Sequence, residues 1–267
     1  MNRDETVLDR ILAGKRKEIE TLKKSEQAGE LENQARRAGP TRDFIAALRD
    51  CPHAAVIAEI KKASPSAGTI RTAVDPAEWA RIYEQNGAAA LSVLTDGPFF
   101  GGGLDDLVRA REAVRLPVLR KDFILDPLQV YQTRAAGADA MLLIAAALSP
   151  VDLKELFFLA LDLGLAPLVE VHNRGELETV MELDPPLVGI NNRNLADLRV
   201  DLETCLNLRP LVTNQALVVG ESGIKGPEDL ARLSAGGLHA FLVGSTLMTS
   251  DDPGAKLADL CRAGVSA

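Results

Sequence analysis

Two hydrophobic patterns divide the chain. From residue 56 onward, short apolar runs alternate with longer stretches in which apolar residues recur at helical spacing. This alternation is typical of βαβ units, in which helices connect the strands of a parallel sheet. The apolar runs predict eight strands, over residues 56–61, 89–94, 118–121, 140–144, 167–171, 187–191, 217–221 and 240–243. Their starts lie about 20 to 33 residues apart, which leaves room for one helix after each strand.

The joints between these elements also repeat. Four predicted helices end on a glycine, which adopts the left-handed conformation at little cost, and a strand follows at a fixed offset. These glycines are Gly87, Gly137, Gly164 and Gly237. Four helix starts place an aspartate or serine cap before a proline, at residues 75–76, 126–127, 149–150 and 252–253. Eight such units favour an α/β fold with a closed (β/α)8 barrel.

An open, doubly wound parallel sheet is the alternative arrangement of these units. Its dinucleotide-binding form carries G-x-G-x-x-G after the first strand, and this chain has no such motif there. The closed barrel is therefore our prediction, and the open sheet is the second arrangement.

About fifty residues precede the first strand. Within residues 2–37, apolar residues recur at near-helical spacing and predict an amphipathic helix that lies against another surface. Residues 27–40 are rich in charged and small residues, so we expect a helix end or linker there, and Phe44, Ile45 and Leu48 mark a second short helix. We expect residues 1–50 to form a helical extension packed on a catalytic barrel of residues 51–267. This extension could cover the mouth of the barrel, its base or a neighbouring subunit.

Composition limits the partners of the protein. The chain has 267 residues, 46% of them hydrophobic, which is enough for a large core. A net charge of −8 and a pI near 5.1 argue against a surface that attracts nucleic acid or an anionic membrane as a whole. The first residues lack the apolar core of a signal peptide, and the longest apolar run, 140–148, is too short to span a bilayer. We expect a cytoplasmic protein that is a monomer or a weak homodimer.

The cysteines and histidines follow no metal-binding or disulfide pattern. Cys51, Cys205 and Cys261 are odd in number and far apart, without a C-x-x-C motif. His53, His172 and His239 likewise lack the spacing of metal ligands. We expect ordinary thiols, structural histidines and no metal.

An unusual charge pair ends the first predicted strand. Residues two apart in a strand share a face, so Glu59 and Lys61 point one way and Ile60 points the other. If their face is the interior, an acid and an ammonium are buried side by side, which is costly unless each has partners. An amphipathic edge strand with both charges in water is the other interpretation of this stretch.

Other predicted strands end on polar residues as well. Lys121, Glu170, Asn191 and Glu221 end the third, fifth, sixth and seventh strands. Each residue alone could mark the point where a strand reaches water. In a barrel, however, the carboxyl ends of all strands meet at one mouth, where catalytic groups gather. Lysines, glutamates and an asparagine from five strands therefore predict an acid–base site that uses no metal or cofactor.

Short glycine motifs follow the last two strands. E-S-G spans residues 221–223, and G-S spans residues 244–245. Barrels commonly hold a phosphate at this place with backbone N–H groups and the N-terminus of a short helix. Glycine lets the backbone approach closely, and Ser245 adds a hydroxyl donor. We therefore predict a small phosphorylated substrate.

Six motifs carry a resemblance to one family. They are I-A-E-I-K-K-A-S-P-S (57–66), L-R-K-D-F-I (119–124), L-V-E-V-H-N (168–173), G-I-N-N-R-N-L (189–195), E-S-G-I (221–224) and G-S-T-L-M (244–248). In this order they resemble indole-3-glycerol-phosphate synthase of the tryptophan pathway, over essentially the whole chain. The resemblance implies a (β/α)8 barrel that converts 1-(2-carboxyphenylamino)-1-deoxyribulose 5-phosphate to indole-3-glycerol phosphate, releasing carbon dioxide and water without a cofactor.

The resemblance also implies roles for the charged strand-end residues. Lys121 would be the general acid of ring closure, and Glu170 would act in the later dehydration. Glu59 would position and tune the lysines and could share in proton transfer. Lys61 would contact the anionic groups of the substrate and could act as a further acid.

Three further groups complete the implied site. Asn191, Arg193 and Glu221 would orient the hydroxyls of the substrate and the catalytic side chains. The phosphate would be held by Lys61, Gly223, Gly244 and Ser245. Ser64 and Ser222 would contact the substrate from the loops after the first and seventh strands.

The anthranilate ring of such a substrate needs an apolar slot, which the resemblance assigns to Phe100 and Leu142. Leu142 lies inside a predicted strand, so barrel core is an equally good interpretation of it. After Phe100 the chain has G-G-G where the family leads us to expect a more polar sequence. We expect the added flexibility to loosen the slot.

Two other functions fit part of this pattern. Another sugar-phosphate barrel, such as phosphoribosylanthranilate isomerase, would share the phosphate site. We would expect that isomerase to carry a cysteine near the end of its first strand, where this chain has Glu59 and Lys61. A barrel that only binds a phosphorylated ligand is the other possibility. Removal of its acid and base side chains would weaken binding of the ligand but would not abolish any reaction.

Overall fold

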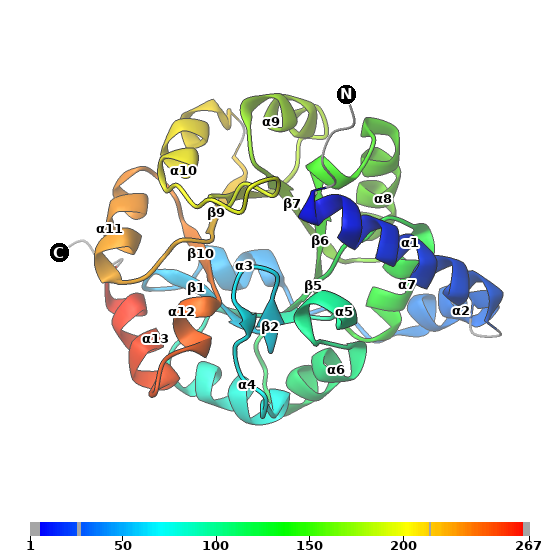
Figure 1. Ribbon diagram of the computed structural model, residues 1–267, viewed down its shortest axis with the longest axis horizontal. Helices are drawn as coiled ribbons and strands as arrows, with labels where there is room; N and C mark the ends of the chain where they lie inside the picture. The colour runs from blue at the N-terminus through cyan, green and yellow to red at the C-terminus, as the bar shows by residue number, and fades with distance from the viewer. Residues whose placement is uncertain (1–5, 26–27, 214, 264–267) are drawn as a thin grey trace.

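The computed structural model describes residues 6–25, 28–213 and 215–263. Eight parallel strands close into a barrel in the order β1-β10-β9-β8-β7-β6-β5-β4 (Figure 1). They are β1 (Ala55–Ile60), β4 (Ala90–Leu94), β5 (Val118–Lys121), β6 (Ala140–Ile144), β7 (Ala166–Val171), β8 (Leu187–Asn191), β9 (Leu217–Glu221) and β10 (Ala240–Val243). The closed barrel is confirmed, and each strand begins and ends within one residue of its predicted bounds.

Helices surround the barrel, one after each strand (Figure 1). They are α4 (Pro76–Gln85), α6 (Leu104–Ala113), α7 (Pro127–Ala135), α8 (Pro150–Asp162), α9 (Arg174–Met181), α10 (Glu203–Leu208), α11 (Pro227–Ala235) and α13 (Pro253–Arg262). Shorter elements occupy the loops: the hairpin β2 (Ala63–Ser64) and β3 (Gly68–Thr69), the helices α5 (Gly97–Phe100) and α12 (Ser245–Met248), and the 3-10 turns η1 (Ala145–Ala147) and η2 (Arg209–Leu211).

The predicted joints form as expected. The four glycines that end helices all have positive φ, at 92° for Gly87, 82° for Gly137, 75° for Gly164 and 87° for Gly237. The four predicted caps each accept a backbone hydrogen bond before a proline in the first turn, namely Asp75, Asp126, Ser149 and Asp252. Local sequence therefore sets where these helices begin and end.

Three helices precede the barrel: α1 (Val7–Lys24), α2 (Ala28–Arg37) and α3 (Phe44–Arg49). The expected helix end or linker over 27–40 is wrong over Ala28–Arg37, because α2 forms there and packs beside α7. Leu31 and Ala35 lie four residues apart and are both buried, so tertiary contact supports a helix that has few apolar residues of its own.

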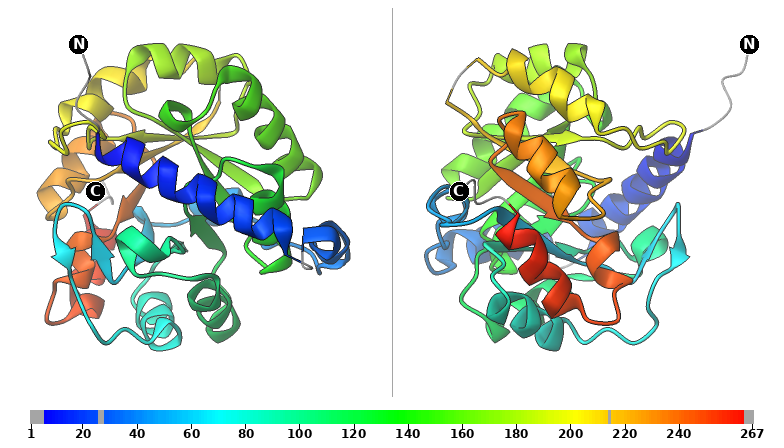
Figure 2. Two further views of the ribbon diagram at one scale, coloured as in Figure 1. Left: turned by 45° about the vertical axis from the view of Figure 1, so that its right-hand side comes forward. Right: turned by 90° about the vertical axis from the view of Figure 1, so that its left-hand side faces the viewer.

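The extension closes both ends of the barrel. Ile11 and Leu12 of α1 and Phe44 and Leu48 of α3 belong to the same buried cluster as the inward-facing strand residues. Helix α1 lies on the side of the molecule that carries the β2–β3 hairpin (Figure 2). Helix α3 contacts β1 and β4 at the opposite end. Of the three placements considered for the extension, the mouth and the base are therefore both occupied.

The barrel strands pack on two sides. Val56, Ala58 and Ile60 join the cluster between strands and helices, whereas Ala55 and Ile57 face the interior. Glu59 has the same parity as Ile57, and only 4% of it is exposed. Because β1 pairs with both β10 and β4, the edge-strand interpretation of the Glu59 stretch is wrong.

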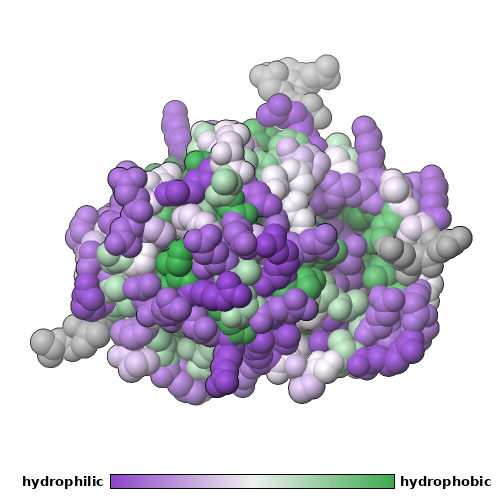
Figure 3. All heavy atoms as spheres, turned by 90° about the horizontal axis from the view of Figure 1, so that it is seen from below, coloured by the Kyte–Doolittle hydropathy of each residue, from purple (hydrophilic) through white to green (hydrophobic). Residues whose placement is uncertain are grey.

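The outer surface is mostly hydrophilic on the side formed by α4, α6 and α13, with apolar groups in small separate areas (Figure 3). Within the described residues, no helix has the length and apolar character needed to cross a membrane. Helix α8, elsewhere on the ring, differs in that it exposes Val151, Phe158 and Leu161.

Candidate active site

A cavity of about 520 Å³ opens at the carboxyl ends of the strands. Every site residue predicted from the sequence lines it: Glu59, Lys61, Ser64, Phe100, Lys121, Leu142, Glu170, Asn191, Arg193, Glu221, Ser222, Gly223, Gly244 and Ser245. The barrel topology brings these residues together although they span most of the chain.

Lys121 lies between two carboxylates at the centre of the cavity. Its Nζ is 2.7 Å from Glu170 Oε2 and 2.9 Å from Glu221 Oε2. Burial alone would lower the pKa of Lys121, but Glu170, Glu221 and Glu59 raise it above its ordinary value. Lys121 is therefore a charged ammonium at neutral pH. It lies at the end of β5 and contacts carboxylates from β7 and β9.

The two carboxylates beside Lys121 differ in charge. Burial would raise the pKa of Glu170, but Lys121 and His172 hold it well below its ordinary value. Burial raises the pKa of Glu221 to about 8, with the neighbouring Glu170 charge acting in the same direction. Lys121 therefore contacts one charged carboxylate, Glu170, and one carboxyl that holds a proton near neutral pH, Glu221.

Asn191 fixes the outer side of Glu170. Its Nδ2 donates to Glu170 Oε1 over 3.1 Å, and its Oδ1 accepts from the backbone N–H of Arg193 over 2.9 Å. The Arg193 guanidinium donates to the carbonyl oxygen of Leu198, which ties it to its own loop. These contacts give the base a set orientation toward Lys121.

A second ion pair lies at the other side of the mouth. Lys61 Nζ is 2.8 Å from Glu59 Oε1, and Gly244 lies so close to both side chains that a Cβ there would overlap them. Next to this pair, Ser222 and Gly223 have φ of 63° and 86°, and Ser245 begins α12. Left-handed backbone and the start of a short helix are features that barrels commonly use to hold a phosphate at this place.

The opposite wall is apolar. Phe100 lies 6.3 Å from Phe123 between ring centroids, and Leu142 lines the cavity while also belonging to the interior cluster. The barrel-core interpretation of Leu142 is therefore confirmed, and its contact with an aromatic ring stays a prediction. Gly101 ends α5 with a φ of 67°, which favours glycine. A Cβ at Gly102 would overlap the backbone of Leu94, so close packing also requires this glycine.

A family model described as indole-3-glycerol phosphate synthase matches residues 8–260. The chain belongs to the indole-3-glycerol phosphate synthase family. This confirms the resemblance drawn from the motifs and makes the chain a member of a tryptophan-pathway family.

Among solved structures, the chain is similar to thiamine phosphate pyrophosphorylase from Pyrococcus furiosus, with a TM-score of 0.59 and 15% sequence identity. The similarity covers 83% of this chain and 97% of that chain. At this identity it shows the barrel fold alone. The match to the indole-3-glycerol phosphate synthase family, in contrast, begins at residue 8 and includes α1.

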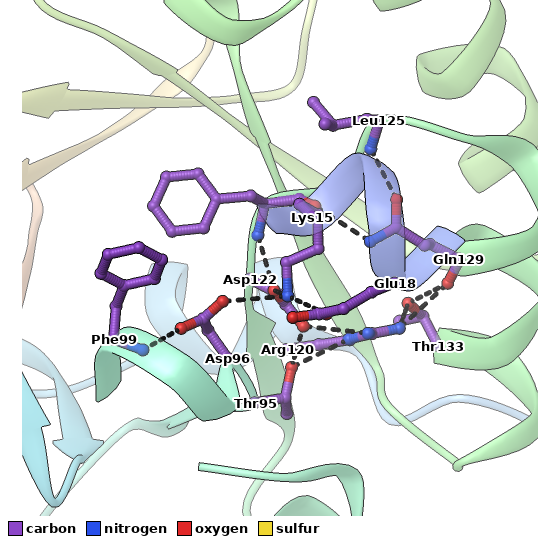
Figure 4. A network of polar contacts seen from close by, with 11 residues as sticks. Lys15, Glu18, Thr95, Asp96, Phe99, Arg120, Asp122, Leu125, Gln129 and Thr133 are labelled. Carbon is purple, nitrogen blue, oxygen red and sulfur yellow. Dashed lines mark hydrogen bonds and ion pairs between the residues drawn. The ribbon is translucent and has the colours of Figure 1, made fainter. Parts of the chain in front are cut away.

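Helix α1 adds a wall to this synthase-family site, at one of the placements that the sequence left open for the extension. Val7, Leu8 and Ile11 line the cavity. Lys15, one turn further along, is 3% exposed and places its Nζ 3.0 Å from both Asp96 Oδ2 and Asp122 Oδ1 (Figure 4). A lysine four residues from Ile11 on the apolar face of a helix was the one signal of this contact in the sequence.

The Lys15 contacts reach two loops of the site. Asp122 directly follows Lys121, and it also accepts from Thr95 and Arg120 (Figure 4). Asp96 caps α5, the short helix that ends with Phe100. Burial would lower the pKa of Lys15, but Asp122, Glu18 and Asp96 raise it, so the ammonium remains charged.

His172 is the second residue that the sequence analysis missed, because it was expected to be structural. It lies next to Glu170, behind the cavity wall. Among the described residues, the His, Cys, Asp and Glu side chains form no group that could hold a metal ion.

Proposed function

We propose that the chain is an indole-3-glycerol-phosphate synthase that converts 1-(2-carboxyphenylamino)-1-deoxyribulose 5-phosphate to indole-3-glycerol phosphate. The observation that supports this most strongly is the Lys121 ammonium 2.7 Å from Glu170 and 2.9 Å from Glu221, at the mouth of a barrel of this family. The cavity is lined by apolar residues such as Phe100 and Leu142 and also by Lys61, Gly223, Gly244 and Ser245. A flat aromatic acid joined to a sugar phosphate fits this lining.

Ring closure needs an acid. The ring carbon that carries the carboxylate attacks the ribulose carbonyl carbon, and the carbonyl oxygen becomes an alkoxide that takes a proton. Lys121 supplies this proton, because a buried ammonium both stabilises the developing negative charge and can donate. The bond to the carboxylate then breaks, carbon dioxide leaves, and the electron pair restores the aromatic ring. The apolar wall favours this step by removing the carboxylate from water.

Dehydration needs both an acid and a base. The hydroxyl leaves as water with a proton from a lysine, and the adjacent carbon of the new ring loses a proton to form the indole double bond. Glu170 takes this proton, since it is the carboxylate that stays charged inside the cavity. Glu59 holds Lys61 for contact with the anionic groups of the substrate.

The remaining residues bind and orient the substrate. Lys61 and the backbone N–H groups of Gly223, Gly244 and Ser245 hold the phosphate. Phe100 and Leu142 hold the aromatic ring, with α1 covering it. Ser64, Arg193 and Ser222 contact the hydroxyls. Asn191 holds Glu170, and Glu221 holds Lys121.

The test is direct. Purified protein is mixed with the carboxyphenylamino-deoxyribulose phosphate, and indole fluorescence and carbon dioxide release are followed together. We expect both signals at a one-to-one ratio. Folded protein that binds this substrate and gives neither signal would be a binding barrel. Protein that gives neither signal but isomerises phosphoribosylanthranilate in a second assay would be the isomerase. Either result overturns the proposal.

We further propose that the enzyme acts in the cytoplasm as a monomer or a weak homodimer. Its acidic, largely hydrophilic surface and three free cysteines support this setting. Sedimentation at increasing protein concentration tests the oligomeric state, and a tight dimer or a larger assembly would contradict it.

A further inference from the structure

His172 is held between two carboxylates. Its Nε2 lies 3.1 Å from Glu170 Oε1, and its Nδ1 lies 3.1 Å from Glu176 Oε2. Glu176 comes from the first turn of α9 and also accepts from the backbone N–H of His172 over 2.8 Å. One carboxylate thus fixes both the backbone and the ring of His172, and only 10% of the side chain is exposed.

The contact with Glu170 acts through charge. Nε2 is close to Glu170 Oε1 but lacks the alignment of a hydrogen bond within the described residues. Burial would lower the pKa of His172, whereas Glu170 and Glu176 raise it to about 10. The ring is therefore an imidazolium at neutral pH, and it gives Glu170 a second cation besides Lys121, which Glu170 shares with Glu221.

We propose that His172 is a positioning residue that keeps the Glu170 base ionised and oriented toward Lys121, with Glu176 as its anchor. His172 does not line the cavity, so it acts through Glu170 and not on the substrate. The inference deepens the proposed function, on which it rests, because it explains how a buried carboxylate stays available as a base.

The charges around the pair determine what loss of the imidazolium does. His172 faces two carboxylates, Glu170 of β7 and Glu176 of α9. Glu170 in turn faces Lys121, Asn191 and Glu221. Without His172, one lysine has to serve two buried glutamates. Burial then favours proton uptake by Glu170, so the base is lost at a higher pH than in the wild-type enzyme.

The experiment compares the pH dependence of kcat between pH 4 and 9 in the wild type and in His172→Gln. We expect the acidic limb to move upward by about one unit or more, so that on this limb the variant is about tenfold less active than the wild type, with a much smaller difference at pH 8.5. KM should change much less, because His172 lies outside the cavity. Glu176→Gln should shift the same limb in the same direction by a smaller amount.

The matched control is Glu178→Gln, which removes a carboxylate from the same helix at an exposed pair with Arg174. Its pH profile should equal that of the wild type. The inference is overturned if the acidic limb stays in place in His172→Gln, or if the loss of activity is equal at every pH. In either case the proposed function stands, provided that the wild type makes indole-3-glycerol phosphate. A wild type without product defeats the proposed function itself.

A second measurement does not depend on how the variants fold. The chain has three histidines, so isotope-labelled histidine gives three imidazole signals in an NMR titration of the wild type. The signal of His172 should show a protonated ring at pH 8, when an ordinary histidine is neutral. A neutral ring at pH 8 would contradict the inference.

Discussion

The Lys121 ammonium contacts both Glu170 and Glu221, and these contacts shift the pKa values of all three side chains. Replacing the lysine removes the acid and leaves two carboxylates facing each other. We expect Lys121→Ala to lower kcat by about a thousandfold or more, while KM changes only several-fold, because the phosphate and aromatic contacts are elsewhere. Steady-state kinetics measure both values. Lys154→Ala, an exposed lysine of α8, is the control, and turnover of Lys121→Ala near that of the control would place the acid elsewhere.

Glu221 lowers the free energy of unfolding by an amount that depends on pH. Its pKa is raised to about 8, so between about pH 5 and 8 the folded chain holds a proton that the unfolded chain has lost. Wild-type stability therefore falls as pH rises through this window. We expect Glu221→Gln to gain stability relative to the wild type between pH 5.5 and 8.5 in urea unfolding. Glu112→Gln, exposed on α6, should show no such trend, and a parallel trend in both variants would contradict the assignment.

Gly244 provides the close approach that the phosphate end requires. A Cβ at this position would overlap Glu59 and contact Lys61 Nζ, so Gly244→Ala should displace this ion pair. We expect KM for the phosphorylated substrate to rise about tenfold or more. Gly103→Ala is the matched control, because nothing lies within 4 Å of its Cβ position. Equal KM values in the two variants would show that the Glu59–Lys61 pair is not needed for binding.

At the scale of elements, Lys15 connects α1 to two loops of the site (Figure 4). Removing one partner of a buried charge cluster costs about 3 kcal/mol. We expect Lys15→Met to lose about that much unfolding free energy and to lower kcat/KM, because the loops with Phe100 and Asp122 lose their common support. Lys23→Met, in the exposed pair with Asp126, is the control and should stay within about 0.5 kcal/mol of the wild type in urea unfolding. Equal losses in both variants would contradict a special role for Lys15.

The elements differ in how far the sequence determines them. The barrel strands were predictable because a short apolar run between a helix-ending glycine and a capped proline leaves few alternatives, as at Gly137 and β6. Helix α2 was not, since its charged sequence becomes helical through burial of Leu31 and Ala35 beside α7. Residues at strand ends followed from topology alone. Lys15 needed distances between elements, which no pattern along the chain contains. His172 lies two residues after Glu170 and four before Glu176, so the local spacing did carry a signal for its contacts.

At the scale of the whole molecule, the extension covers both ends of one barrel, and the two ends have different tasks. Phe44 of α3 packs with the interior cluster, away from the cavity, whereas Ile11 of α1 packs with the same cluster and also lines the cavity. Catalytic groups lie at the carboxyl ends of barrel strands, so packing at the amino ends serves stability alone. Stability and catalysis should therefore separate along the barrel axis.

Paired core variants test this separation. Phe44→Ala should cost about 3 to 5 kcal/mol of unfolding free energy, and Ile11→Ala about 2 to 4, because each leaves a cavity in a buried cluster. Only Ile11→Ala should raise KM, by about threefold or more, since its side chain forms part of the wall proposed to hold the aromatic ring. Urea unfolding and steady-state kinetics on the same preparations measure both quantities. A similar rise of KM in Phe44→Ala would mean that the base of the barrel controls the mouth, and the two ends would not be separate.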